Sequence, residues 1–296
     1  MAATHLDRWA QWLLHDRHGG DESSLRKQLE WLAPVRDKIL TEASVGLDDI
    51  VLDVGCGEGL VGFGALPLVG DSGRVVFTEV SEKLLESCRN IASEIGVTPR
   101  CRFVRTPAET LAGIESGSVD VVTTRSVLIY VADKAAAFDS FRRVLRPGGR
   151  ISLFEPINRR YLALNKDTLF GYDIRPVAEA AAKVRAVFES AAPPDGSMLG
   201  FDESDLLDFV ERAGFEDITV RLELSSSSNT PYAGMPWSKL LATSPNPTAP
   251  TYGKAIAEAL TDDEAAAFEA HLRPLVEESA PGRIRHSVAY VSARRP

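Results

Sequence analysis

Cysteine and long apolar runs are both scarce in this sequence. The three cysteines among its 296 residues, Cys56, Cys88 and Cys101, form no Cys-x-x-Cys pair and no Cys/His pattern that fits a metal. We therefore expect neither a disulfide framework nor a metal site, and predict reduced thiols in a cytoplasmic protein. No run approaches the ~18 apolar residues of a membrane span, and no secretory leader pattern is visible, so no membrane association is predicted.

Positive charge is also in the minority. Lys and Arg total 33 against 42 for Asp and Glu, which gives a formal net charge of −9. Nucleic-acid binding normally needs a basic surface, so no nucleic-acid partner is predicted. Apolar residues at 44% and charged residues at 25% are ordinary for a globular protein and argue against disorder.

Short apolar runs alternate with helical patterns from residue 50 onward. Such runs, ended by glycine, are typical of strands buried on both faces of a parallel sheet. The alternation predicts an α/β fold with a doubly wound, mostly parallel Rossmann-like sheet. Its seven strands are expected at 50–54, 74–80, 101–106, 119–125, 150–156, 215–224 and 286–293.

The segments around this core are predicted to cover one edge of the sheet. A Gly-Gly-Asp turn is expected at 19–21, between two N-terminal helices, and one helical stretch near 253–279. We divide the chain into an N-terminal helical lid (1–45), a core (46–156), an insertion contributing to a cap (157–201), a core helix with strand six (202–225), a cap insertion (226–284) and strand seven (285–296).

The glycine-rich segment VLDVGCGEGL, 51–60, carries the most information about function. Gly55, Gly57 and Gly59 follow a strand and precede a helix, where glycine lets backbone N–H groups approach a ligand. A dinucleotide-binding loop needs a third glycine where this chain has Leu60. Asp53 suits a ligand with a cationic group better than a pyrophosphate, and Glu79 ends the next strand, where a carboxylate can accept ribose hydroxyls.

Five segments of the core resemble the class I S-adenosylmethionine-dependent methyltransferases of the small-molecule type. They are VLDVGCGEG, FTEVS, FVRTPAETL, VDVVTTRSVLIYV and RRVLRPGGRISLFEP, within 48–156. The resemblance implies S-adenosylmethionine as methyl donor and S-adenosylhomocysteine as product. It also implies cofactor-binding roles by position: Gly55, Cys56 and Gly57 at the methionine part and ribose, Asp53 toward the cationic centre, Glu79 on the ribose, Val80, Ala108 and Glu109 around adenine, and the carbonyl of Arg125 on the ammonium.

One position departs from the family pattern. Many relatives have an Asp where this chain has Pro107, and that Asp accepts a hydrogen bond from the adenine amino group. Proline has neither a side-chain acceptor nor a backbone N–H. How adenine is recognised is therefore left open, with Glu109 or a water molecule as substitutes.

Methyl transfer from a sulfonium needs few side chains, because the leaving group is already activated. Tyr130 and Glu155, at the carboxyl ends of two strands, are the catalytic candidates, although each also fits a structural role. Arg17 is a candidate for the cofactor carboxylate. The cap regions and lid contain many aromatic residues, which favours a small, planar or apolar acceptor in an enclosed pocket: Trp9, Trp12, Tyr161, Phe170, Tyr172, Phe188, Tyr232, Trp237 and Tyr252.

Several hypotheses remain open from the residues alone. A methyltransferase acting on a small, aromatic metabolite, as in specialised metabolism, agrees best with the motifs. A nicotinamide-dependent oxidoreductase is disfavoured by Leu60 and Asp53, and a protein or RNA methyltransferase by the acidic charge and large cap. A non-catalytic cofactor-binding protein also fits. The acceptor atom and the oligomeric state are open, with a homodimer as one option.

Overall fold

The computed structural model describes residues 7–17, 22–193, 195–228 and 230–296. One seven-stranded sheet forms its centre, with the order β3-β2-β1-β4-β5-β9-β8. Strands β1 to β5 run parallel, and β9 runs antiparallel to both β5 and β8, which confirms the predicted doubly wound sheet. The bounds are β1 (Ile50–Val54), β2 (Arg74–Glu79), β3 (Cys101–Arg105), β4 (Val119–Arg125), β5 (Leu145–Pro156), β8 (Glu216–Ser227) and β9 (Ile284–Arg294).

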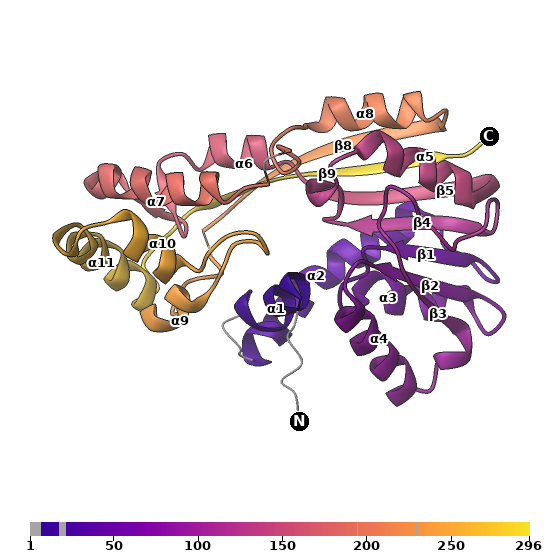
Figure 1. The fold of residues 1–296 in the computed structure, drawn as a ribbon, viewed down its shortest axis with the longest axis horizontal. Helices are drawn as coiled ribbons and strands as arrows, with labels where there is room; N and C mark the ends of the chain where they lie inside the picture. The colour runs from indigo at the N-terminus through magenta and orange to yellow at the C-terminus, as the bar shows by residue number, and fades with distance from the viewer. Residues whose placement is uncertain (1–6, 18–21, 194, 229) are drawn as a thin grey trace.

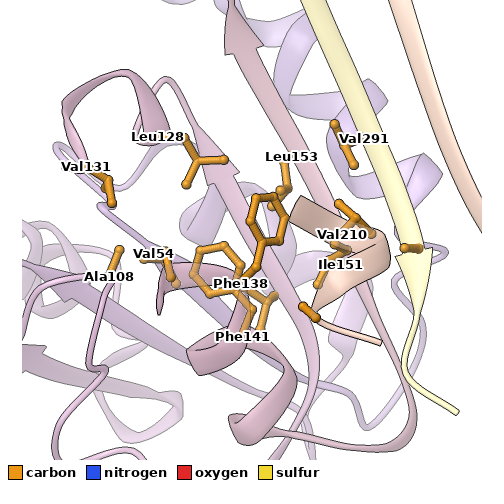
Figure 2. Packing of buried hydrophobic residues seen from close by; sticks show 14 of the residues in the cluster. Val54, Ala108, Leu128, Val131, Phe138, Phe141, Ile151, Leu153, Val210 and Val291 are labelled. Atoms are coloured by element: carbon orange, nitrogen blue, oxygen red, sulfur yellow. The ribbon is translucent and has the colours of Figure 1, made fainter. Parts of the chain in front are cut away.

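Helices cover both faces of the sheet, because successive side chains of a strand point to opposite sides. On one face α5 (Lys134–Val144) and α8 (Glu203–Arg212) pack Phe138, Phe141 and Val210 against Ile151 and Leu153, as Figure 2 shows. The other face carries α2 (Glu22–Glu42), α3 (Leu60–Val69) and α4 (Glu82–Glu94). Both clusters are built around buried strands, so the strand ends are held rigidly in place.

A separate hydrophobic cluster forms the cap. Figure 1 shows its helices grouped at the far end of the long β8–β9 ribbon, with α1 (Arg8–Gln11) between this group and the sheet. The β8–β9 pairing runs from Glu216 opposite Arg294 to Ser227 opposite Ile284. The remaining elements are α6 (Asn158–Leu164), β6 (Thr168–Leu169), β7 (Tyr172–Asp173), α7 (Ala178–Ser190), α9 (Trp237–Ala242), α10 (Tyr252–Ala259) and α11 (Asp262–Glu277).

Two local expectations differ from the structure. The single helical stretch predicted at 253–279 is two helices, because Thr261 and Glu264 form a reciprocal capping box that starts α11. The first lid helix is only α1 followed by one wide turn, Trp12–Asp16. The turn predicted at 19–21 lies outside the described residues. No helix in the described ranges is long and apolar enough to cross a membrane.

Candidate active site

The glycine loop after β1 is shaped by backbone conformations that favour glycine. Gly55, Gly57 and Gly59 have φ values of 63°, 54° and 82°. A Cβ atom on Gly55 would lie 2.5 Å from Cγ2 of Val127, in the turn after β4. The loop is therefore pressed against the neighbouring turn, and its backbone is presented at the carboxyl edge of the sheet, where ligands of such folds bind.

Glu79, the last residue of β2, binds the backbone of this loop. One carboxylate oxygen accepts the N–H of Gly57 at 3.1 Å, and the other accepts those of Val80 at 2.7 Å and Ser81 at 3.2 Å. A carboxylate has about four acceptor sites, so about one remains for a ligand hydroxyl. Burial raises the pKa of Glu79, and the neighbouring carboxylate of Asp7 raises it further.

Asp53 lies behind the loop rather than at its surface. Its carboxylate accepts the N–H of Gly62 at 2.8 Å, near the start of α3, and the hydroxyl of Thr123 at 3.3 Å. Only 2% of the residue is exposed, and burial raises its pKa to about 7. Asp53 therefore anchors the helix that follows the loop, and its predicted role toward a cationic ligand would have to act through the electric field rather than by contact.

The residues predicted around adenine line the adjacent part of the edge. Val80 is 38% exposed, unusually so for a large apolar side chain beside a buried strand end. Ala108 is buried, Glu109 is half-buried and Pro107 is exposed. The carbonyl of Glu109 accepts the hydroxyl of Ser140 at 2.7 Å, which fixes the backbone of this segment. Val80 thus offers an open apolar surface, as stacking against a planar base requires.

Glu155 holds the turn that follows β4. Its fully buried carboxylate accepts the N–H groups of Val127 and Leu128 at 3.0 Å, that of Ile129 at 3.3 Å, and the hydroxyl of Thr124 at 3.2 Å. Burial raises the pKa of Glu155 to about 7. Three of these groups bind one carboxylate oxygen and the N–H of Ile129 binds the other, so Glu155 positions the turn after β4, and its catalytic role stays a prediction.

The N-terminal segment crosses the site and touches three parts of the molecule. Asp7 caps α1 and also accepts the hydroxyl of Ser81 at 2.6 Å, directly after Glu79. The ring of Trp9 meets that of Tyr130 edge-on, with centroids 4.9 Å apart. Trp12 donates its indole N–H to the carbonyl of Ser244 in the cap at 3.0 Å. The lid is therefore closed over the glycine loop in this structure.

Arg17 of the lid and Arg125 at the end of β4 act on each other's surroundings through their charges. The guanidinium carbon of Arg17 lies 4.9 Å from the Trp12 ring centroid, and burial together with the charge of Arg125 lowers the pKa of Arg17 to about 10. Burial likewise lowers the pKa of Arg125. Burial raises the pKa of Tyr130, so its hydroxyl is protonated at neutral pH and can donate a hydrogen bond but cannot act as a base. Glu58 lies near both arginines. Burial raises the pKa of its carboxyl group, and the charges of Arg17 and Arg125 oppose this rise.

The cap aromatics pack mainly against one another. The ring of Phe170 contacts those of Tyr232, Trp237 and Tyr252 with centroids 5.2, 6.3 and 4.7 Å apart, and Phe188 meets Tyr252 at 5.2 Å. These rings form the core of the cap, so their number alone does not define an aromatic pocket. Cavities of about 310 and 500 Å³ lie elsewhere, beside α7 and at the amino edge of the sheet.

Three features of the site had no distinct signal in the sequence. Ser81 caps α4, and its hydroxyl also binds the carboxylate of Asp7. The side chain of Arg125 was not considered, because the family resemblance concerns only its carbonyl. The anchoring role of Glu155 depends on a turn some 26–28 residues earlier in the chain. Such contacts depend on the register of the sheet and cannot be found from local patterns.

Sequence comparisons place the chain among methyltransferases. Residues 51–149 match the family model described as a methyltransferase domain. The nocamycin O-methyltransferase of Saccharothrix syringae is 30% identical over 282 residues, covering 90% of this chain and 92% of that protein. The ubiquinone/menaquinone biosynthesis C-methyltransferase UbiE of Cronobacter sakazakii is 31% identical over 176 residues, covering 57% of this chain and 66%, just under two thirds, of that protein.

A structural comparison agrees with these matches. Geranyl diphosphate C-methyltransferase from Streptomyces coelicolor, solved with Mg²⁺, geranyl diphosphate and S-adenosylhomocysteine, superposes with a TM-score of 0.54 at 15% identity, covering 94% of this chain and 84% of that one. At this identity the likeness shows a shared fold. Together with the loop geometry and the full-length relative, it leads to one conclusion: the chain belongs to the class I S-adenosylmethionine-dependent methyltransferases.

Proposed function

We propose that this methyltransferase methylates an oxygen atom of a small organic molecule of specialised metabolism. The observation that carries the proposal is the 30% identity to the nocamycin O-methyltransferase. An alignment covering 90% of the chain necessarily includes most of the two cap regions. The cap regions and the lid flank the crevice at the carboxyl edge, so they are the elements expected to select the acceptor.

The residues at the carboxyl edge fit S-adenosylmethionine. The glycine loop offers its backbone, Glu79 keeps about one acceptor site for a ribose hydroxyl, and Val80 offers an apolar surface for adenine. When bound, this cofactor supplies a methyl group on a sulfonium, which is transferred by in-line displacement. The protein's own contribution is to hold both partners in line and to exclude water.

Enclosure of the acceptor follows from the lid and the cap. Trp9 and Tyr130 pack together above the loop, and Trp12 joins the lid to Ser244 of the cap. Closing these elements over bound ligands removes water from the reacting atoms. The aromatic acceptor suggested by composition has weaker support, because most cap rings contact one another; Trp9 and Tyr130, at the edge of the site, are the aromatic groups best placed to meet a ligand.

The alternatives differ in how they account for the site. Family membership removes the nicotinamide-dependent oxidoreductase as a main hypothesis. A protein or RNA substrate would need an open, exposed surface at the carboxyl edge, whereas the lid covers it. A cofactor-binding protein without methyl transfer is distinguished by product formation.

Calorimetric titration tests the cofactor assignment first. We expect S-adenosylhomocysteine to bind with low micromolar or better affinity, about −8 kcal/mol, and NAD and NADP not to bind. Incubation with S-adenosylmethionine and a panel of hydroxylated and acidic small molecules, followed by mass spectrometry, tests O-methylation. Binding of NADP in preference to S-adenosylhomocysteine, or methylation found only on protein or RNA, would contradict the proposal.

A further inference from the structure

We propose that the side chain of Arg125 binds the methyl acceptor, and that this acceptor is an organic oxyanion, either a carboxylate or an acidic enolate, methylated on oxygen. The inference rests on the proposed function and specifies its substrate class. It gives Arg125 a second role, because the family resemblance involves only the carbonyl of this residue.

The sheet places Arg125 at the reacting end of the site. It is the last residue of β4 and pairs with Phe154 of β5. Thr123, two residues earlier, bonds the carboxylate of Asp53, and side chains two apart on a strand share a face. Arg125 therefore lies on the same face as Asp53, one step closer to the edge that the glycine loop and the lid enclose.

The guanidinium of Arg125 is half-buried without a partner. Within the described residues no hydrogen bond or ion pair engages it, although Asp53, Glu155 and Glu58 act on it through space. Other partly covered arginines are satisfied: Arg100 donates to the carbonyls of Leu66 and Gly70, and Arg150 pairs with Asp49 at 2.6 Å. A buried charge without hydrogen bonds is costly, so a ligand is the natural partner for Arg125.

The turn after Arg125 is held in an uncommon conformation. Ser126 has a φ of 58°, which side chains other than glycine rarely adopt. Its N–H donates to the carbonyl of Phe154 at 2.7 Å, and Glu155 binds the next three N–H groups. Backbone strain that the surroundings enforce is concentrated at functional sites. Here the conformation of Ser126 fixes the direction of the chain at the end of β4, and so the backbone position of Arg125.

An oxyanion acceptor also fits the state of the two catalytic candidates. Tyr130 is protonated, and the carboxylate of Glu155 accepts four hydrogen bonds from the segment that it positions. An acceptor that arrives as an anion needs no base: a lone pair of its oxygen forms the new O–CH₃ bond, the CH₃–S bond breaks, and its electron pair stays on sulfur. No proton is released, and the negative and positive charges cancel. Arg125 would hold one oxygen of a carboxylate while the other attacks.

The main rival role for Arg125 is contact with the carboxylate of the cofactor itself, for which Arg17 is the candidate predicted from the sequence. The charge of Arg125 lowers the pKa of Arg17, so the two arginines are close and both ligand groups would meet in one small region. The rival role predicts a loss of cofactor affinity when Arg125 is replaced, whereas acceptor binding predicts a loss of acid recognition alone.

The test compares acids with their neutral counterparts on protein saturated with S-adenosylhomocysteine. Benzoate, cinnamate, phenylacetate, octanoate and 4-hydroxycoumarin are titrated calorimetrically beside the matching amides or the methyl ether. We expect at least one acid to bind tenfold or more tightly than its neutral counterpart. In Arg125→Gln that preference should fall to about onefold, and Arg125→Lys should restore part of it.

Matched controls separate the outcomes. Arg102→Gln removes an exposed arginine of β3 that donates only to the carbonyl of Gly113, and it should leave the acid preference unchanged. Affinity for S-adenosylhomocysteine should stay within twofold in Arg125→Gln, and thermal unfolding checks the fold. A tenfold loss of that affinity, or a panel without any acid preference, overturns the proposal. Failure of the wild type to bind S-adenosylhomocysteine would instead refute the proposed function.

Discussion

The carboxylates at the two edges of the sheet differ in the kind of partner that satisfies them. At the amino edge, Asp120 accepts the N–H of Ile50 at 2.7 Å and pairs with Arg146 at 2.8 Å. Asp49 accepts the N–H of Gly46 at 3.0 Å and pairs with Arg150. At the carboxyl edge, the carboxylates of Asp53, Glu79 and Glu155 accept only N–H and hydroxyl groups, and no ion pair among the described residues neutralises them.

This difference separates charge that supports the fold from charge kept for a ligand. An ion pair at the rim of a sheet satisfies both partners and leaves nothing for a third group. Carboxylates with raised pKa values lie near Arg125, which pairs with none of the described residues, and these groups remain able to respond to a bound cation or anion. Substitutions at the two edges should therefore have different consequences, and three experiments test this.

The largest effect is expected for Gly55→Val. The new side chain would collide with Val127, and the residue would have to adopt a φ of 63°, which valine disfavours. The loop backbone must therefore shift from the position in which it can contact the ligand. We expect binding of S-adenosylhomocysteine to be abolished in calorimetry while circular dichroism shows a native fold.

Gly117→Ala is the matched control for this substitution. Gly117 also has a positive φ, 65°, but it lies near the amino edge and a Cβ there meets nothing within 4 Å. It should lower the free energy of unfolding by about 1 kcal/mol and leave cofactor affinity unchanged. Normal cofactor binding by Gly55→Val would show that the loop has been misassigned.

Glu79→Ala should weaken S-adenosylhomocysteine binding at least tenfold. It removes a charge-assisted bond to the ribose, worth roughly 1.5–3 kcal/mol, and also frees the N–H of Gly57 in the loop. At the amino edge, Asp120→Asn breaks the pair with Arg146 and should lower the free energy of unfolding by about 1 kcal/mol, with affinity unchanged within twofold. Equal effects of both variants on affinity would remove the distinction between the edges.

The third experiment concerns the pH dependence of stability. The pKa of Asp53 is raised by burial from 3.8 to about 7, so the folded protein retains a proton that the unfolded chain loses. The stability of the wild type relative to Asp53→Asn should be highest below about pH 4 and should fall as the pH rises to about 7. Urea unfolding at several pH values measures this difference. A constant difference across that range would mean that Asp53 titrates normally.

The sequence was sufficient to predict the sheet and the glycine loop at its carboxyl edge. Both rest on local patterns: short apolar runs predicted β1 to β5, and three glycines at fixed spacing predicted the loop. Glu79 was identified from its place at the end of a strand. Its contact with Gly57 then follows from the parallel pairing of β1 and β2.

What could not be predicted depends on pairing between distant segments. The break between α10 and α11 is an exception, since Thr261 and Glu264 form a capping box whose residue types and spacing are local features of the sequence. The roles of Glu155 and Arg125 depend on which strands lie side by side and which face each residue occupies. The aromatic residues of the cap show the reverse problem, because composition cannot distinguish rings that form a core from rings that line a pocket.

The lid sets a constraint on timing. Its segment from Asp7 to Asp16 is bound at one end to Ser81, beside Glu79, and at the other to Ser244 of the cap, through the indole of Trp12 and the carbonyl of Asp16. Because this short segment is bound at both ends, breaking its contacts with the cap is expected to weaken its contact with Ser81 as well. Entry of the acceptor and exit of the spent cofactor are therefore expected to share one gate.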